Sequence, residues 1–218
     1  DGSAFPQANY SVTYDGFVGD EGTSDLADTL AYTGTAIAAT VTGTYVITPS
    51  GLTSDNYSIV YEDGELSITQ RDISEASIAD IADLVYTGSA QTVSPEVTFS
   101  SLNLVEDTDY TTSFEGNTNA GTATITLTGI GNYTGTQTKE FTITSKTLTI
   151  TAEDKTKVYD GSAFPQANYS VTYDGFVGDE GTSDLADTLA YTGTAIAATV
   201  TGTYVITPSG LTSDNYSI

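Results

Sequence analysis

The side chains of this sequence that could do chemistry are carboxylates. Asp20, Glu21, Asp25 and Asp28 share one loop, and Glu153 with Asp154 lies near a predicted module boundary. Ca²⁺ takes about six to eight oxygen ligands, so a loop dense in carboxylates is a candidate site. The spacing of these acids matches no EF-hand loop. Two interpretations stay open: solvated surface acids, or ligands for Ca²⁺, which is the only cofactor that the sequence suggests.

Other kinds of catalytic site are excluded by composition. The chain has no His and no Cys, so it has no Ser-His-Asp triad, no thiolate nucleophile, no zinc site of the usual kind and no disulfide. Pairs of carboxylates occur by chance in a chain with 29 acidic residues, so they do not indicate a glycosidase. We predict that the protein is not an enzyme.

The charge of the chain limits its partners. There are 29 acidic and 5 basic residues, which gives a net charge of −24. Nucleic acids and anionic membranes both require Lys and Arg, so neither is an expected partner. No run of about 18 apolar residues is present, and we expect no membrane insertion in this segment. The absence of Cys and Met suits an extracellular location.

The four loop acids, Asp20, Glu21, Asp25 and Asp28, lie within a sequence that occurs twice. Residues 1–59 recur without a substitution as residues 160–218, which is a repeat period of 159 residues. Such identity is typical of long arrays and indicates recent duplication. We expect the chain to be part of a longer repetitive protein.

The local pattern predicts an all-β fold. Tyr, Thr, Val and Ile alternate in short runs that are broken by Gly, Asp and Asn. One helical turn is predicted at residues 25–30. The Asp63-Gly64 pair predicts a hairpin between strands at 56–61 and 66–69. Further strands are predicted at 74–79, 84–86, 92–99, 110–114, 121–127 and 139–144.

Internal alignment predicts three small Ig-like β-sandwich modules in an elongated array, with boundaries 1–69, 70–146 and 147–218. Tyr57 and Tyr133 lie at matching positions and are candidates for tyrosine corners. Tyr86 and Tyr159 also match and are predicted to be structural. The copy at residue 1 lacks a first strand and the copy at residue 160 lacks a last hairpin. We expect either a slice of a continuous fibre or strand exchange between chains.

Four motifs carry a resemblance to known repeats. The series Leu-Thr-Ile-Thr-Ala, Lys-Val-Tyr-Asp-Gly, Asn-Tyr-Ser-Ile and Gly-Glu-Leu-Ser-Ile-Thr resembles the MBG-type repeats of bacterial surface proteins. The middle module, with Val-Tyr-Thr-Gly-Ser-Ala and Gly-Asn-Tyr-Thr-Gly-Thr, is similar to bacterial Ig-like repeats. One departure is Asp160-Gly161, where such repeats usually have Gly directly after Lys-Val-Tyr.

This resemblance implies an extracellular stalk of a large adhesin on a bacterial cell surface. The expected partners are neighbouring repeats of the same protein, through strand exchange or filament self-assembly. The alternative is that the repeats themselves bind a glycan, a matrix protein or ice, with or without Ca²⁺. Some surface stalks of this kind carry Lys–Asn or Lys–Asp isopeptide cross-links, for which the candidates here are Lys139, Lys146, Lys155 and Lys157.

Overall fold

The computed structural model describes residues 2–218 and confirms the all-β class. The described residues form strands and short 3₁₀ turns and contain no α-helix. The chain folds as two compact units, one made of residues 2–77, 97–111 and 127–137, the other of residues 78–96, 112–126 and 138–218. The middle module contributes to both units, and the module boundaries after residues 69 and 146 stay predictions. The 3₁₀ turns are η1 (Gln7–Asn9), η2 (Thr23–Asp25), η3 (Thr35–Ala38), η4 (Ile73–Glu75), η5 (Gln166–Asn168), η6 (Thr182–Asp184) and η7 (Thr194–Ala197).

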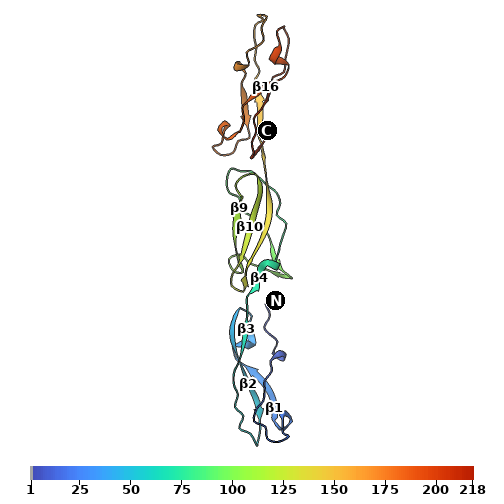
Figure 1. Ribbon diagram of the computed structural model, residues 1–218, viewed down its shortest axis with the longest axis vertical. Helices are drawn as coiled ribbons and strands as arrows, with labels where there is room; N and C mark the ends of the chain where they lie inside the picture. The colour runs from blue at the N-terminus through green and yellow to red at the C-terminus, as the bar shows by residue number, and fades with distance from the viewer. Residues whose placement is uncertain (1) are drawn as a thin grey trace. The chain divides into compact units, whose positions relative to one another are not determined.

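The first copy contains a three-stranded antiparallel sheet with β2 (Gly43–Thr53) at its centre (Figure 1). β1 (Ala27–Thr33) pairs with the second half of β2, and β3 (Gly64–Ile68) pairs with the first half. Along β2 the half-buried Tyr45 and Ile47 alternate with the exposed Thr44 and Val46. This period of two puts the larger side chains on one face of the sheet.

Two local predictions in this copy are wrong. Most of residues 25–30, predicted to be helical, belong to β1, because pairing with β2 gives their backbone groups long-range partners. Asp28 takes a φ of 66° next to a register shift in that pairing. The predicted hairpin is also absent, since β3 pairs with β2 and residues 56–61 contain no strand. Instead, the Tyr61 hydroxyl donates to the Leu52 carbonyl at 2.9 Å and accepts from the Leu52 amide at 2.7 Å.

Residues 70–146 form the predicted strands with modified bounds. One sheet has the order β6-β12-β10-β9, in which β9 and β10 lie side by side (Figure 1). A smaller sheet has the order β5-β7-β8, and β4 pairs with β11 in parallel. On β10, Ala123, Ile125 and Leu127 are buried and alternate with Thr residues. The strands are β4 (Arg71–Asp72), β5 (Ser77–Ile78), β6 (Leu84–Val85), β7 (Val97–Phe99), β8 (Leu102–Asn103), β9 (Tyr110–Glu115), β10 (Gly121–Gly129), β11 (Tyr133–Thr134) and β12 (Thr136–Thr144).

The third module consists of three strand pairs. β13 (Lys146–Thr147) runs parallel to β18 (Tyr216–Ser217). β14 (Thr149–Ala152) and β15 (Val171–Asp174) are antiparallel, as are β16 (Ala190–Thr192) and β17 (Thr207–Ser209).

Identical residues in the two copies take different secondary structure. Residues 171–174 are a strand because β14 pairs with them, whereas the same four residue types at 12–15 form no strand. Conversely, residues 43–47 are a strand because β3 pairs with them, whereas the same residues at 202–206 lack that partner and are strand only from Thr207 onward. The pairing partner, rather than local propensity, therefore decides which residues extend.

Candidate functional site: the joint around Glu180

A single residue, Ser145, separates β12 from β13 near the predicted boundary between the middle and third modules. The next strand, β13, is hydrogen-bonded to β18 from its first residue. The amide of Lys146 donates to the carbonyl of Asn215 at 2.9 Å, and the amide of Leu148 donates to the carbonyl of Ser217 at 3.0 Å. The Leu148 side chain is buried. Because its backbone is hydrogen-bonded, this connection is part of the fold rather than a flexible linker.

A hydrophobic cluster extends across this connection. The rings of Tyr86, from the middle module, and Tyr216, from the third, meet edge to face with their centroids 5.6 Å apart. Full burial of one large apolar side chain contributes about 1.5–3 kcal/mol, so separating the modules would expose costly surface. The buried members of the cluster are Tyr86, Ala123, Ile125, Phe141, Ile143, Leu148 and Tyr216.

The carboxylate of Glu180 accepts hydrogen bonds from tyrosines of both modules. Its Oε1 accepts from the Tyr86 hydroxyl, and its Oε2 accepts from the Tyr216 hydroxyl. The turn that presents Glu180 is closed by the Glu180 amide, which donates to the Val177 carbonyl at 3.0 Å. The Val177 amide in turn donates to the hydroxyl oxygen of Tyr216 at 3.0 Å. One acidic side chain thus connects residues on either side of the predicted boundary after residue 146, within one compact unit.

These hydrogen bonds keep both hydroxyls protonated. The bond to Glu180 raises the pKa of Tyr86 to about 12. Burial, and then the bond to the same carboxylate, raises the pKa of Tyr216. A tyrosine donates only while it holds its proton, so the contact is complete below the ordinary tyrosine pKa and is lost as pH rises through the raised one.

Gly88 allows the Tyr86 loop to approach the third module. Its φ is +75°, and a Cβ at this position would lie 2.9 Å from Val177 Cγ2 and 3.3 Å from Glu180 Oε1. Any other residue would therefore meet both strain and a clash. We call Tyr86, Gly88, Val177, Glu180 and Tyr216 the joint.

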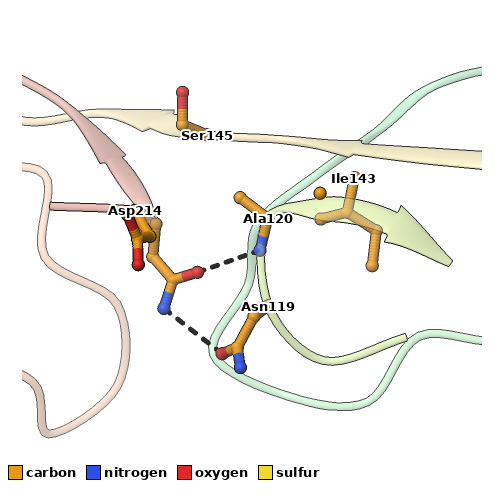
Figure 2. Close-up of a pocket in the computed structure, with 7 residues that line it drawn as sticks. Asn119, Ala120, Ile143, Ser145 and Asp214 are labelled. Atoms are coloured by element: carbon orange, nitrogen blue, oxygen red, sulfur yellow. Dashed lines mark hydrogen bonds between the residues drawn. The ribbon is translucent and has the colours of Figure 1, made fainter. Parts of the chain in front are cut away.

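Asn215 makes a second contact between these modules. Its Oδ1 accepts from the Ala120 amide at 2.9 Å, and its Nδ2 donates to Asn119 Oδ1 at 3.3 Å. Figure 2 shows these bonds beside a cleft of about 510 Å³, which Ile143 and Asp214 also line.

The first compact unit contains a similar connection. The Asn132 side chain accepts from the Thr42 amide at 2.9 Å, as Asn215 does from Ala120. The Arg71 amide donates to the Asn132 carbonyl at 2.9 Å. Gln70 Nε2 donates to the carbonyls of Gly131 and Tyr133 at 3.0 and 3.1 Å. Asn132 and Asn215, which open an Asn-Tyr-Thr and an Asn-Tyr-Ser motif, thus each accept a hydrogen bond from a backbone amide of the preceding module.

The predicted structural tyrosines lie in different surroundings. The Tyr57 hydroxyl accepts from the Val18 amide at 3.1 Å and donates to Glu21. Tyr133 is buried, and its ring stacks on Phe99 at 6.4 Å. Tyr86 belongs to the joint, and the side chain of Tyr159 is 65% exposed.

The calcium candidates are not brought together. Asp25 accepts from the Gly22 amide at 2.8 Å, Asp28 accepts from Thr53, and Glu153 pairs with Lys155 at 3.0 Å. Glu21 accepts from Tyr57, and Asp20 and Asp154 are exposed. Among residues 2–218, no three acidic side chains are grouped so that they could hold a metal ion. Calcium binding stays a prediction without a site.

Three of the cross-link candidates form ion pairs at the surface. Lys139 pairs with Asp80 at 2.8 Å, Lys155 with Glu153 at 3.0 Å, and Lys157 with Asp160 at 2.7 Å. The carboxylate partners are substantially exposed, so these pairs contribute little to stability.

The main residues of the joint were not found from the sequence. Glu180 was missed, although its counterpart Glu21 had been considered as a calcium ligand. Gly88 and Asn215 are part of the motifs Val-Tyr-Thr-Gly-Ser-Ala and Asn-Tyr-Ser-Ile, which indicated only the resemblance to known repeats. The recurrence of Tyr-Xaa-Gly at Tyr86 and Tyr159, and of Asn-Tyr-Ser/Thr at Asn56, Asn132 and Asn215, was the available signal, because residues at module contacts must recur together.

The family model for the MBG domain (YGX type) matches residues 1–67 and 148–218, which is more than half of the chain. The chain belongs to this family. The expected resemblance to MBG-type repeats is therefore confirmed for the first and third modules, and residues 68–147 lie outside the match. No curated protein and no solved structure matches the chain.

MBG repeats typically occur in surface proteins, and the MBG domain is a structural or adhesin-type module. Within the described part of the chain, no helix has the length and apolar character needed to cross a membrane.

Proposed function

We propose that this chain is a spacer segment of an extracellular stalk on a bacterial cell surface, and that its role is to hold a distal element away from the cell. The observation that carries the proposal is the joint, in which Glu180 binds Tyr86 and Tyr216, from either side of the predicted module boundary. A spacer needs connections that resist bending, and a strand-paired, buried connection has this property.

The connections at both ends of the middle module support the same role. Each begins with a parallel strand pair, β4 with β11 and β13 with β18. In each, an Asn side chain accepts from a backbone amide of the preceding module. The net charge of −24 adds mutual repulsion between neighbouring stalks and keeps them soluble.

Chains of one, two and three complete periods, each begun at Thr147 in the repeat and ended after the next Lys146, test the proposal by small-angle scattering. A spacer predicts a maximum dimension that grows in proportion to the number of periods. A compact particle for three periods would contradict the proposal.

The alternative, that the repeats bind a ligand themselves, is tested on the same single-period chain. Glycans, matrix proteins and ice are screened in Ca²⁺ and in EDTA, with thermal unfolding followed in both buffers. A spacer predicts no saturable binding and equal Tm values. Saturable binding would make the repeat the adhesive element, and a Tm raised by Ca²⁺ would indicate metal sites.

A further inference from the structure

The middle module begins and ends in two segments that run in the same direction. We call residues 70–86 the entry segment and residues 131–144 the exit segment. β4, at the start of the entry segment, pairs in parallel with β11, at the start of the exit segment. β6, at the end of the entry segment, pairs in parallel with the end of β12. Both segments lie in the interior of the sequence, with described residues before and after them.

Side chains join the two segments between these strand pairs. Gln137 Nε2 donates to the carbonyls of Ser74 and Ala76 at 2.7 and 3.1 Å, where a 3₁₀ turn interrupts the entry segment. Two residues further along β12, Lys139 pairs with Asp80 at 2.8 Å. This ion pair is at the surface and contributes little strength. The contacts therefore follow the same order along both segments, from one strand pair to the next.

The start of the entry segment is held by several kinds of contact. The Arg71 amide donates to the Asn132 carbonyl at 2.9 Å. The Arg71 guanidinium lies 3.4 Å from the centroid of the Phe99 ring, in a cation–π contact, and Phe99 stacks on Tyr133. The amide side chain of Gln70 donates to two further carbonyls of the exit segment. The first residues of the module are thus fixed beside its exit segment.

The other end of the two segments is fixed by hydrogen bonds from both strands. The Tyr86 amide donates to the Thr144 carbonyl at 2.9 Å. The Thr144 hydroxyl donates to the Leu84 carbonyl at 3.0 Å. The last contact of the exit segment therefore lies next to Ser145, where the chain leaves β12.

This arrangement determines how the module responds to a pull along the chain. The pull acts on the entry segment at its first residue and on the exit segment at its last. Because the segments are parallel, the two forces point in opposite directions along the strands, and the segments must slide past each other. The hydrogen bonds run across the pair, so they are loaded together. Two antiparallel segments would instead be pulled at adjacent ends, and their bonds would break one after another.

We propose that the middle module is a mechanical clamp, in which the entry and exit segments resist end-to-end force by shear. The proposal rests on the spacer function, because a stalk on a cell surface is pulled between its anchor and the element that it holds. Forced unfolding is governed by the unfolding rate rather than by equilibrium stability. The clamp therefore gives the module a resistance to force that its Tm does not report.

Single-molecule force spectroscopy on the whole chain tests the proposal. The natural chain has no Cys, so introduced thiols define the points of attachment. Thr69→Cys with Ser145→Cys pulls the segments in shear. Thr87→Cys with Ser145→Cys pulls at the adjacent ends of β6 and β12 and peels them apart. All three positions are exposed. At equal pulling speed, the shear geometry should unfold at a several-fold higher force, with a gain in length of roughly 200–250 Å.

A substitution in the middle of the segments separates shear resistance from general stability. Gln137→Met removes the donor to the carbonyls of Ser74 and Ala76 and keeps a side chain of similar length. It should lower the unfolding force in the shear geometry and leave the peeling force unchanged, because peeling begins at the far end. Thr142→Ala, at an exposed position of the same strand, is the matched control and should change neither force.

Two results would overturn the proposal. One is an equal unfolding force in the two geometries, and the other is an equal loss of force in both geometries for Gln137→Met. The clamp and the spacer can also fail separately. A module that is weak in shear, in an array whose length grows with the number of periods, overturns the clamp alone. A strong module in a compact array overturns the spacer alone.

Discussion

Replacing Glu180 with alanine should destabilise the unit that contains the joint. The substitution removes the acceptor of two hydroxyls, on Tyr86 and Tyr216, whose residues are only 4% and 3% exposed. A buried donor left without a partner costs about 1–3 kcal/mol. Glu180 itself is half-buried and water reaches one side of it, so we take the lower part of the range and expect about 2–3 kcal/mol in total.

Differential scanning calorimetry measures this loss. A destabilisation of that size lowers Tm by about 6–12 °C in a unit of roughly one hundred residues or more. Glu21→Ala is the matched control, because the local sequence is identical but Glu21 is exposed and accepts from Tyr57 only. Its effect should be about 2 °C or less, as is usual for surface substitutions.

Equal shifts for Glu180→Ala and Glu21→Ala would refute this reasoning, because they would show that Glu180 stabilises only its own turn. A double-mutant cycle with Tyr86→Phe and Glu180→Gln provides a second check. The two substitutions should be coupled, with a double mutant that is less destabilised than the sum of the single mutants. Additive effects would mean that the two side chains do not interact.

Three further predictions concern the loop that contains Tyr86 and Gly88 and the matching loop at residues 157–161. Gly88→Ala should lower the Tm of the unit that contains the joint far more than Gly161→Ala does. Both glycines have a positive φ, but only at residue 88 would the added Cβ clash with a neighbouring side chain. Similar losses of Tm would show that the φ alone matters. In alkaline spectrophotometric titration, Tyr86 should ionise near pH 12, and Tyr86→Phe should remove this last ionisation. The joint should lose stability as pH rises from about 10 toward that value. By NMR, Asp160 should titrate near pH 2, and its pKa should move toward the ordinary range in Lys157→Met. The contact with Lys157 therefore stabilises the fold above about pH 4, and this stabilisation is lost as pH falls through 2. An unchanged pKa in Lys157→Met would contradict the assigned cause.

The parts of the fold that follow from local pattern were predictable. The strand predicted at residues 121–127 is present as β10, where Ala123, Ile125 and Leu127 are buried and alternate with Thr. The predictions for residues 25–30 and 56–61 were wrong because the structure of these residues depends on distant partners. Local propensity does not show that β3 will pair with β2 instead of with the residues next to its turn.

The joint could not be predicted in the same way. Glu180 looks like one acid among 29, and its role arises only when two tyrosines from different modules reach it. Gly88 suggested a turn, and the need for close approach to Val177 is visible only once the two modules are packed.

The location of the joint within the repeat has a genetic consequence. Tyr86 and Glu180 both lie within a single period of 159 residues, and the flanking copies are identical. Unequal recombination between such copies inserts or deletes whole periods, and each event brings a complete tyrosine–glutamate pair with it. The protein can therefore become longer or shorter in steps of one period, and each step preserves the existing kinds of contact between modules.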